Sequence, residues 1–117
     1  MTRMIKIYHN PRCSTSRNAL QAIEASGRPV EIIEYLKDLP ARDELRALIR
    51  DAGLTVREAM RTKESIYQEL GLDDPALSDE RLLEAIERHP VLLNRPFVVT
   101  GKGVRLCRPL ERLQEIL

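Results

Sequence analysis

The fold is decided by residues 4–35, MIKIYHNPRCSTSRNALQAIEASGRPVEIIEY. Residues 4–8 are apolar except for one lysine, an alternation typical of a β-strand, and the polar loop at Pro11 ends that strand. Apolar residues then recur at helical spacing, and Gly27 predicts a left-handed end to the helix. Residues 30–35 are rich in β-branched side chains and predict a second strand. A strand, a helix and a strand in this order predict a parallel pair with a right-handed crossover.

The residues that follow predict a helical insertion. Apolar residues at helical spacing before Gly53 predict an amphipathic helix, and shorter helical pieces are expected around residues 56–60 and 64–70. Ser78 is a predicted N-cap, and the helix that it starts has an acidic first turn and a basic last turn before Pro90. The apolar positions of the two longer helices are Leu45, Leu48, Ile49, Ala52, Leu82, Leu83 and Ile86.

The C-terminal residues predict two more strands and a last helix. Residues 97–100 and 104–107 have strand character, and a three-residue turn with two glycines, 101–103, joins them in an antiparallel hairpin. Pro109 suits the first turn of a final helix. Its buried stripe is expected to be Leu110, Leu113, Ile116 and Leu117. The order β, α, β, helical insertion, β, β, α predicts a single α/β domain over residues 1–117.

Composition and charge exclude several classes of protein. The 117 residues carry 19 basic and 18 acidic side chains, a net charge of +1, which gives no basic field for nucleic acid. No apolar run approaches the roughly 20 residues of a membrane-spanning helix, and residues 1–7 lack a signal-peptide core. Two widely separated cysteines match neither a metal site nor a secreted disulfide pattern, so we expect a cytoplasmic protein in a reducing compartment.

Cys13 is the predicted nucleophile. It stands between the end of a parallel strand and the start of a helix, where unpaired backbone N–H groups and the helix dipole stabilise negative charge. Cysteines at helix starts have pKa values of about 3.5 to 7.5, so thiolate becomes a major species at neutral pH. Hydroxyl side chains follow at positions 14–16, and Asn10 and Arg12 precede it. The alternative is a buried structural thiol, which these polar neighbours disfavour.

The second cysteine does not form a redox pair with the first. Cys107 lies in an apolar strand and is expected to pack as a small hydrophobic residue. A partner at the C-x-x-C spacing would occupy position 16, which is a serine, Ser16. No local thiol can therefore resolve an oxidised Cys13, and the chain needs an external one.

Because the net charge is nearly balanced, any anion must be bound by a local cluster of cations. Taken singly, Arg61, Arg95 and Arg108 are each expected to be solvated surface charges. Arg95 precedes Pro96 directly before a strand, where an X-Pro bond can be cis, and the sequence leaves both isomers open.

Residues 8–17, YHNPRCSTSR, carry a recognisable active-site pattern, and further motifs follow it in order. These are Tyr35-Leu36, Arg42-Asp43-Glu44-Leu45, Arg61, Glu69-Leu70-Gly71-Leu72, His89-Pro90, Asn94-Arg95-Pro96, Val98-Val99-Thr100 and Arg105-Leu106-Cys107-Arg108-Pro109. Together they resemble the glutaredoxin-coupled arsenate reductase family over nearly the entire chain.

The resemblance implies a thioredoxin-like fold, with a mixed four-stranded sheet flanked by helices and a helical insertion between strands 2 and 3. It implies that Cys13 attacks arsenate and that three arginines, Arg61, Arg95 and Arg108, hold the oxyanion and the arsenite product. The residues expected to surround these groups are His9, Asn10, Ser16 and Arg17. His9 either stabilises the thiolate as an imidazolium or hydrogen-bonds the backbone.

The resemblance further implies glutathione and glutaredoxin as external reductants, without a bound metal or prosthetic group. We also expect a monomer without nucleic-acid or membrane partners. Typical members extend beyond the last helix, whereas this chain stops at Leu117, and Arg12 replaces a small residue that often precedes the cysteine. A shorter branch of relatives resembles the chain as well.

Two other functions stay open. One is a glutathione-dependent oxidoreductase with another substrate, such as a different oxyanion or a glutathionylated molecule. The other is an Spx-like regulator that binds RNA polymerase and senses oxidation. Such sensors commonly carry C-x-x-C, which residues 13–16 lack, and they do not need the set of arginines. The enzyme is therefore favoured over the regulator.

Overall fold

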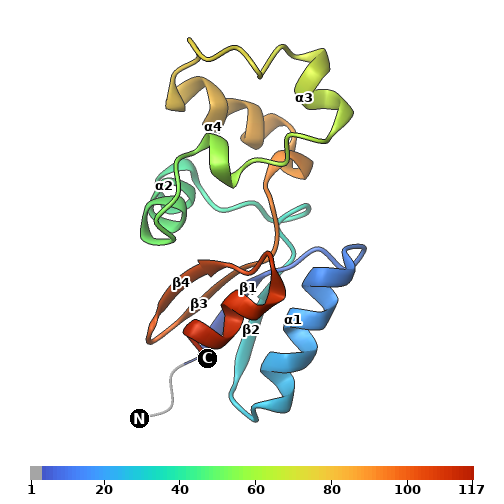
Figure 1. Ribbon diagram of the computed structural model, residues 1–117, viewed down its shortest axis with the longest axis vertical. Helices are drawn as coiled ribbons and strands as arrows, with labels where there is room; N and C mark the ends of the chain where they lie inside the picture. Colours follow the sequence, from blue (N-terminus) through green and yellow to red (C-terminus); the bar gives the residue numbers. More distant parts are fainter. Residues whose placement is uncertain (1–3) are drawn as a thin grey trace. The chain divides into compact units, whose positions relative to one another are not determined.

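The computed structural model describes residues 4–117 (Figure 1). These residues form two compact units: the described residues up to Asp38 with Arg95–Leu117, and the segment Leu39–Asn94. The single domain expected for residues 1–117 stays a prediction. The expectation that the chain starts without a signal peptide falls partly on residues 1–3, which lie outside the described residues.

The first unit contains a mixed four-stranded sheet in the order β2-β1-β3-β4. The strands are β1 (Ile5–Tyr8), β2 (Val30–Ile33), β3 (Phe97–Thr100) and β4 (Gly103–Leu106). β1 pairs in parallel with β2 and antiparallel with β3, which in turn pairs antiparallel with β4. The predicted sheet is confirmed, and β2 ends two residues before the predicted limit.

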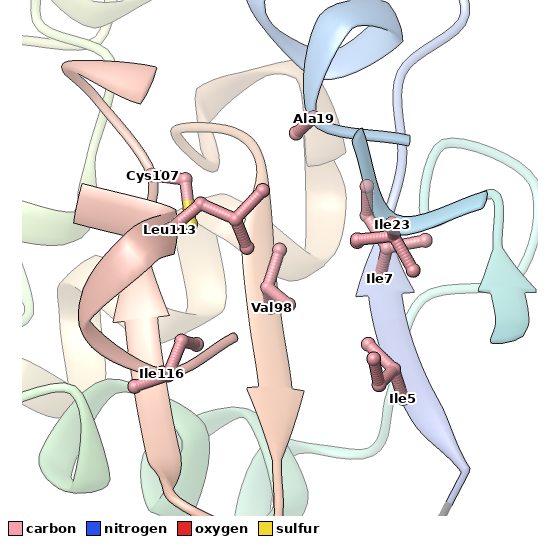
Figure 2. Close-up of a cluster of buried hydrophobic side chains, with 8 residues drawn as sticks. All are labelled: Ile5, Ile7, Ala19, Ile23, Val98, Cys107, Leu113 and Ile116. Atoms are coloured by element: carbon pink, nitrogen blue, oxygen red, sulfur yellow. The ribbon is translucent and has the colours of Figure 1, made fainter. Parts of the chain in front are cut away.

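A single apolar core joins the sheet to the helix α1 (Ser14–Ala25) and to the 3-10 helix η3 (Leu110–Glu115). Figure 2 shows the side chains of this core, which come from α1, β1, β3, the residue after β4, and η3 with its C-cap residue. They are Ile5, Ile7, Ala19, Ile23, Val98, Cys107, Leu113 and Ile116. The helical spacing of Ala19 and Ile23 places both on the face of α1 that packs against the sheet. This core holds α1 against the sheet.

The hairpin and the last helix differ from the prediction in detail. Thr100 pairs with Gly103, so the turn has two residues rather than three, and Gly103 adopts a φ of 144° within β4. A positive φ of this kind is accessible to glycine without a steric cost. The last helix is 3-10 rather than α, and Pro109 is its N-cap residue rather than part of its first turn.

The second unit is helical, as predicted. Its elements are α2 (Arg42–Asp51), η1 (Arg57–Ala59), α3 (Ser65–Glu69), α4 (Asp79–Arg88) and η2 (Pro90–Leu92). Ser78 caps α4 by accepting a hydrogen bond from the backbone N–H of Arg81 at 3.2 Å, which confirms the predicted N-cap. Arg42 of α2 forms ion pairs with Glu80 and Glu87 of α4 and links the two helices.

The left-handed glycines end helices in both units. Gly27 follows α1 with a φ of 77°, as predicted from the sequence, and Gly53 follows α2 with the same φ. Among residues 4–117, no helix is both long and apolar enough to cross a bilayer.

We predict that Ile23→Ala lowers the free energy of unfolding by about 2 to 5 kcal/mol, because it opens a cavity in the core between α1 and the sheet. Ile32→Ala is the matched control, since Ile32 is 45% exposed on β2, and its cost should stay below about 1 kcal/mol. Urea unfolding followed by circular dichroism measures both values. Equal losses in the two variants would contradict the assigned core.

Candidate active site

Cys13 occupies the N-cap position of α1, at the end of the loop that follows β1. The loop is short and closed by backbone hydrogen bonds. The N–H of Cys13 donates to the carbonyl of Asn10 at 3.0 Å, and the N–H of Arg17 donates to the carbonyl of Cys13 at 3.0 Å. Cys13 is half-buried, and its backbone is extended, with φ −96° and ψ 122°. The thiol therefore lies at the start of the helix, as predicted.

The buried hydroxyl of Ser16 holds the loop against the first turn of α1. Ser16 Oγ accepts a hydrogen bond from the N–H of Asn10 at 3.1 Å and shares a hydrogen bond of 2.7 Å with His9 Nδ1. All three residues are buried. A buried backbone N–H that has no hydrogen-bond partner costs free energy. Ser16 removes this cost by accepting the hydrogen bond of the Asn10 N–H. The position that is cysteine in a C-x-x-C motif has a structural function here.

Two further side chains fix the outer part of the loop. Asn10 Oδ1 accepts a hydrogen bond from the N–H of Arg12 at 2.9 Å. Arg17 Nη1 donates to the carbonyl of Pro11 at 2.9 Å. The predicted surrounding residues His9, Asn10, Ser16 and Arg17 are thus brought together around the loop by the structure. Their side chains contact the loop, and the backbone N–H of Ser16 also stabilises the thiolate of Cys13.

The strand register brings two arginines to the same end of the sheet as Cys13. Tyr8 at the end of β1 pairs with Phe97 at the start of β3, and Phe97 pairs with Leu106 at the end of β4. Arg95 lies two residues before Phe97, and Arg108 lies two residues after Leu106. Consequently both arginines reach the loop that follows β1. The Arg95-Pro96 and Arg108-Pro109 peptide bonds are both cis.

Arg108 is in direct contact with the nucleophile. Its Nη1 lies 3.5 Å from Cys13 Sγ and donates a hydrogen bond to it, and the same atom donates to the carbonyl of Arg95 at 3.3 Å. Arg95 is buried, with 8% of its surface exposed. The expectation that Arg95 is a solvated surface charge is therefore wrong. Arg95 is buried because of the register of the hairpin, which the sequence does not determine.

Positive charge and a backbone N–H stabilise the thiolate of Cys13. Burial raises the pKa of Cys13, but the backbone N–H of Ser16 and the guanidinium groups of the two arginines outweigh it. The pKa of Cys13 is consequently lowered from its ordinary value. The contrast with the other cysteine is large, because burial raises the pKa of Cys107 to about 12. Cys107 is an inert core residue, as predicted.

The imidazole ring of His9 is held by a hydrogen bond to a side chain. Burial lowers the pKa of His9, opposed by the charge of Glu34. Its Nδ1 engages the hydroxyl of Ser16. The ring therefore bonds to a side chain rather than to the backbone, and its role as an imidazolium beside the thiolate stays a prediction.

Arg61, the third predicted arginine, belongs to the second unit. Its Nε donates to Glu64 Oε1 at 2.9 Å, and its backbone N–H donates to the carbonyl of Leu92 at 2.7 Å. About a quarter of the side chain is exposed, at 28%. The contribution of Arg61 to oxyanion binding stays a prediction.

A cavity of about 450 Å³ opens beside Arg108 in the first unit. Its lining residues are Thr15, Asn18, Arg108, Pro109, Leu110 and Glu111. Sequence reasoning missed Asn18 and Glu111 as candidate site residues. The signal that points to Asn18 is its position three residues after Thr15 on the same face of α1. Glu111 carries no such signal, because only the fold brings η3 beside α1.

We predict that Ser16→Ala lowers the free energy of unfolding by about 1 to 3 kcal/mol, since it leaves the buried N–H of Asn10 without its acceptor. Ser14→Ala is the control, because Ser14 is exposed, and its effect should stay within about 0.5 kcal/mol. Urea unfolding of both variants gives the comparison. The assigned role of Ser16 fails if the two substitutions cost the same.

Alkylation should distinguish the two thiols. In the folded protein at pH 7, iodoacetamide should modify Cys13 and leave Cys107 intact, and modification of Cys107 should require unfolding. Because the pKa of Cys13 is lowered, the rate of its alkylation should stay high as the pH falls through the range in which an ordinary cysteine becomes protonated. Mass spectrometry of tryptic peptides reads both sites. Comparable rates at the two cysteines would contradict the described environments.

Comparisons with known proteins agree with this geometry. The model of the ArsC family matches residues 8–116. An arsenate reductase of Rhizobium meliloti is 55% identical to this chain, and the match covers 97% of this chain and 81% of the relative. An arsenate reductase of Escherichia coli K12 is 51% identical, and the match covers 97% of this chain and 80% of the relative. The solved structure of an arsenate reductase from Vibrio cholerae has a TM-score of 0.94 and 43% identity, and the match covers 100% of both chains. The fold is thioredoxin-like, and the chain belongs to the ArsC family.

Proposed function

We propose that this protein is an arsenate reductase that uses Cys13 as its nucleophile and takes its reducing equivalents from glutathione and glutaredoxin. The observation that carries the proposal is the hydrogen bond from Arg108 to Cys13 Sγ at 3.5 Å, at the start of α1. It places a cation where both a thiolate and an oxyanion need one. Relatives named arsenate reductase share about half of the sequence, at 55% and 51% identity, which supports the choice of substrate.

The first step is binding of the oxyanion. Guanidinium groups bind tetrahedral oxyanions through two parallel charge-assisted hydrogen bonds, which a lysine cannot do. Arg95 and Arg108 lie beside the sulfur, and Arg61 is proposed to complete the set. Their charges also lower the cost of bringing an anionic substrate towards an anionic sulfur.

The second step joins sulfur to arsenic. The Cys13 thiolate attacks the arsenic of dihydrogen arsenate, an S–As bond forms, and one oxygen leaves as water after accepting a proton. The adduct is a thioester of arsenate, in which arsenic is still pentavalent. The arginines hold the charge of the remaining oxygens.

The third step moves two electrons to arsenic. A glutathione thiolate attacks the sulfur of Cys13, an S–S bond forms and the S–As bond breaks. The electron pair of that bond goes to arsenic, which becomes trivalent and leaves as arsenous acid after taking up protons. Glutaredoxin then attacks the glutathione sulfur of the mixed disulfide and releases the Cys13 thiolate.

The need for external thiols follows from the environments of the other candidate groups. Ser16 occupies the C-x-x-C position and is committed to hydrogen bonds with His9 and Asn10. Cys107 lies in the core, where its pKa of about 12 leaves it protonated. Neither can resolve an oxidised Cys13. We therefore place the protein in the cytoplasm, where glutathione and glutaredoxin are present, acting as a monomer without a bound cofactor.

The test measures arsenite formed from arsenate by purified protein with glutathione and glutaredoxin. Wild-type protein should turn over, and Cys13→Ser should abolish turnover because an alcohol at this position is not ionised. Cys107→Ala is the control and should retain activity, since that thiol lies in the core. Absence of arsenite with wild-type protein would refute arsenate as the substrate, and loss of activity in Cys107→Ala would refute the need for an external thiol.

A further inference from the structure

The cavity beside Arg108 has no function in the oxyanion steps described above. It lies within the first unit, between α1 and the start of η3, and its volume of about 450 Å³ is within the range of small-molecule sites. The lining combines a cation, a carboxylate, a hydroxyl, an amide and two apolar residues. Such a mixture suits a ligand that carries charges of both signs.

Arg108 connects the cavity to the nucleophile. Arg108 lines it and also donates to Cys13 Sγ at 3.5 Å. Thr15 lies two residues after Cys13 on α1, and Asn18 lies three residues further on the same helical face. A molecule that contacts Arg108 in this cavity is therefore separated from the sulfur by one side chain.

The carboxylate of the cavity is available for a ligand. On η3, Glu115 is committed to Arg105 at 2.8 Å and to Arg112 at 3.9 Å. Glu111 instead lies one turn earlier, exposed, in the wall of the cavity. Thr15 and Asn18, which carry a hydroxyl and an amide, line the same cavity.

We propose that this cavity is the glutathione subsite of the protein, an assignment that rests on the proposed function. Glutathione carries an ammonium group and two carboxylates at its ends and a thiol in its middle. Glu111 accepts hydrogen bonds from the ammonium group, and Thr15 and Asn18 donate to carboxylate or peptide oxygens. The bound thiolate then attacks Cys13 sulfur, forms the S–S bond and sends the electron pair of the broken S–As bond to arsenic.

A second cavity of the first unit suits glutathione less well. It measures about 460 Å³ and is lined by His9, Asn10, Pro11, Arg12, Glu34, Leu36 and Lys37. Two of its charges, Glu34 and Lys37, pair with each other at 4.0 Å. Arg108, which donates a hydrogen bond to Cys13 Sγ, lines the first cavity and not this one. The second cavity therefore supplies the control.

The test follows formation of the Cys13–glutathione mixed disulfide from glutathione disulfide, by mass spectrometry of the full chain without arsenate. In this exchange Cys13 thiolate attacks one sulfur and releases glutathione thiolate. Glu111→Gln and Asn18→Ala should each slow the reaction at least about tenfold, as loss of a hydrogen bond to a charged group predicts. Both residues are exposed, so the fold is retained.

Three controls make the outcome specific. Hydroxyethyl disulfide has no charges, and its rate with Cys13 should be the same in wild-type protein and both variants. Lys37→Gln, in the other cavity, should leave both rates unchanged. The disulfide of N-acetylated glutathione, which lacks the ammonium group, should react equally with wild-type protein and with Glu111→Gln.

The subsite is refuted if Glu111→Gln and Asn18→Ala react with glutathione disulfide at the wild-type rate, or if they slow hydroxyethyl disulfide to the same extent. A loss confined to Lys37→Gln would place glutathione in the second cavity and also refute the assignment. Because the exchange uses no arsenate, this result is independent of the arsenite assay. Selective slowing supports the subsite even where no arsenite is formed.

Discussion

The stabilisation of one negative charge, on the sulfur of Cys13, is the interaction on which the site depends. Burial opposes that charge, whereas the N–H of Ser16 and the guanidinium groups of Arg95 and Arg108 favour it, and the favourable interactions prevail. The molecule obtains them from three separate segments: the start of α1 and the two ends of the hairpin that flank β3 and β4. The mixed sheet brings these segments to one edge, so the chemistry depends on strand register as much as on the identity of the residues.

The same fold gives its two cysteines opposite properties. Cys13 lies at a helix start beside a guanidinium group, and Cys107 lies in the core shared by α1, the sheet and η3 (Figure 2). Ser16 uses its hydroxyl to close the loop, so it satisfies a buried N–H where a related redox protein would hold a second thiol. Cys13 is therefore the reactive thiol among these residues, and the proposed dependence on external reductants follows because it has no thiol partner in the core or at position 16.

Much of this molecule is predictable from periodicity and capping residues. The alternation in β1, the spacing of Ala19 and Ile23, the Ser78 cap and the position of Cys13 at a helix start each depend on neighbours in sequence, and the structure confirms them. Burial of Arg95 and the pairing of Thr100 with Gly103 depend on register between strands, which local patterns do not determine. The cavity that includes Asn18 and Glu111 depends on the packing of η3 against α1, a contact between segments far apart in the chain.

Titration of Cys13 itself tests the central claim most directly. Protein labelled with carbon-13 at the cysteine Cβ reports the protonation of each thiol by NMR as pH is varied. The account predicts that the Cys13 signal titrates at a lower pH in the folded protein than in the urea-unfolded chain, since the folded environment lowers its pKa. A folded-state midpoint at or above the unfolded value would contradict the account, because the arginines and the helix start would then fail to stabilise the thiolate.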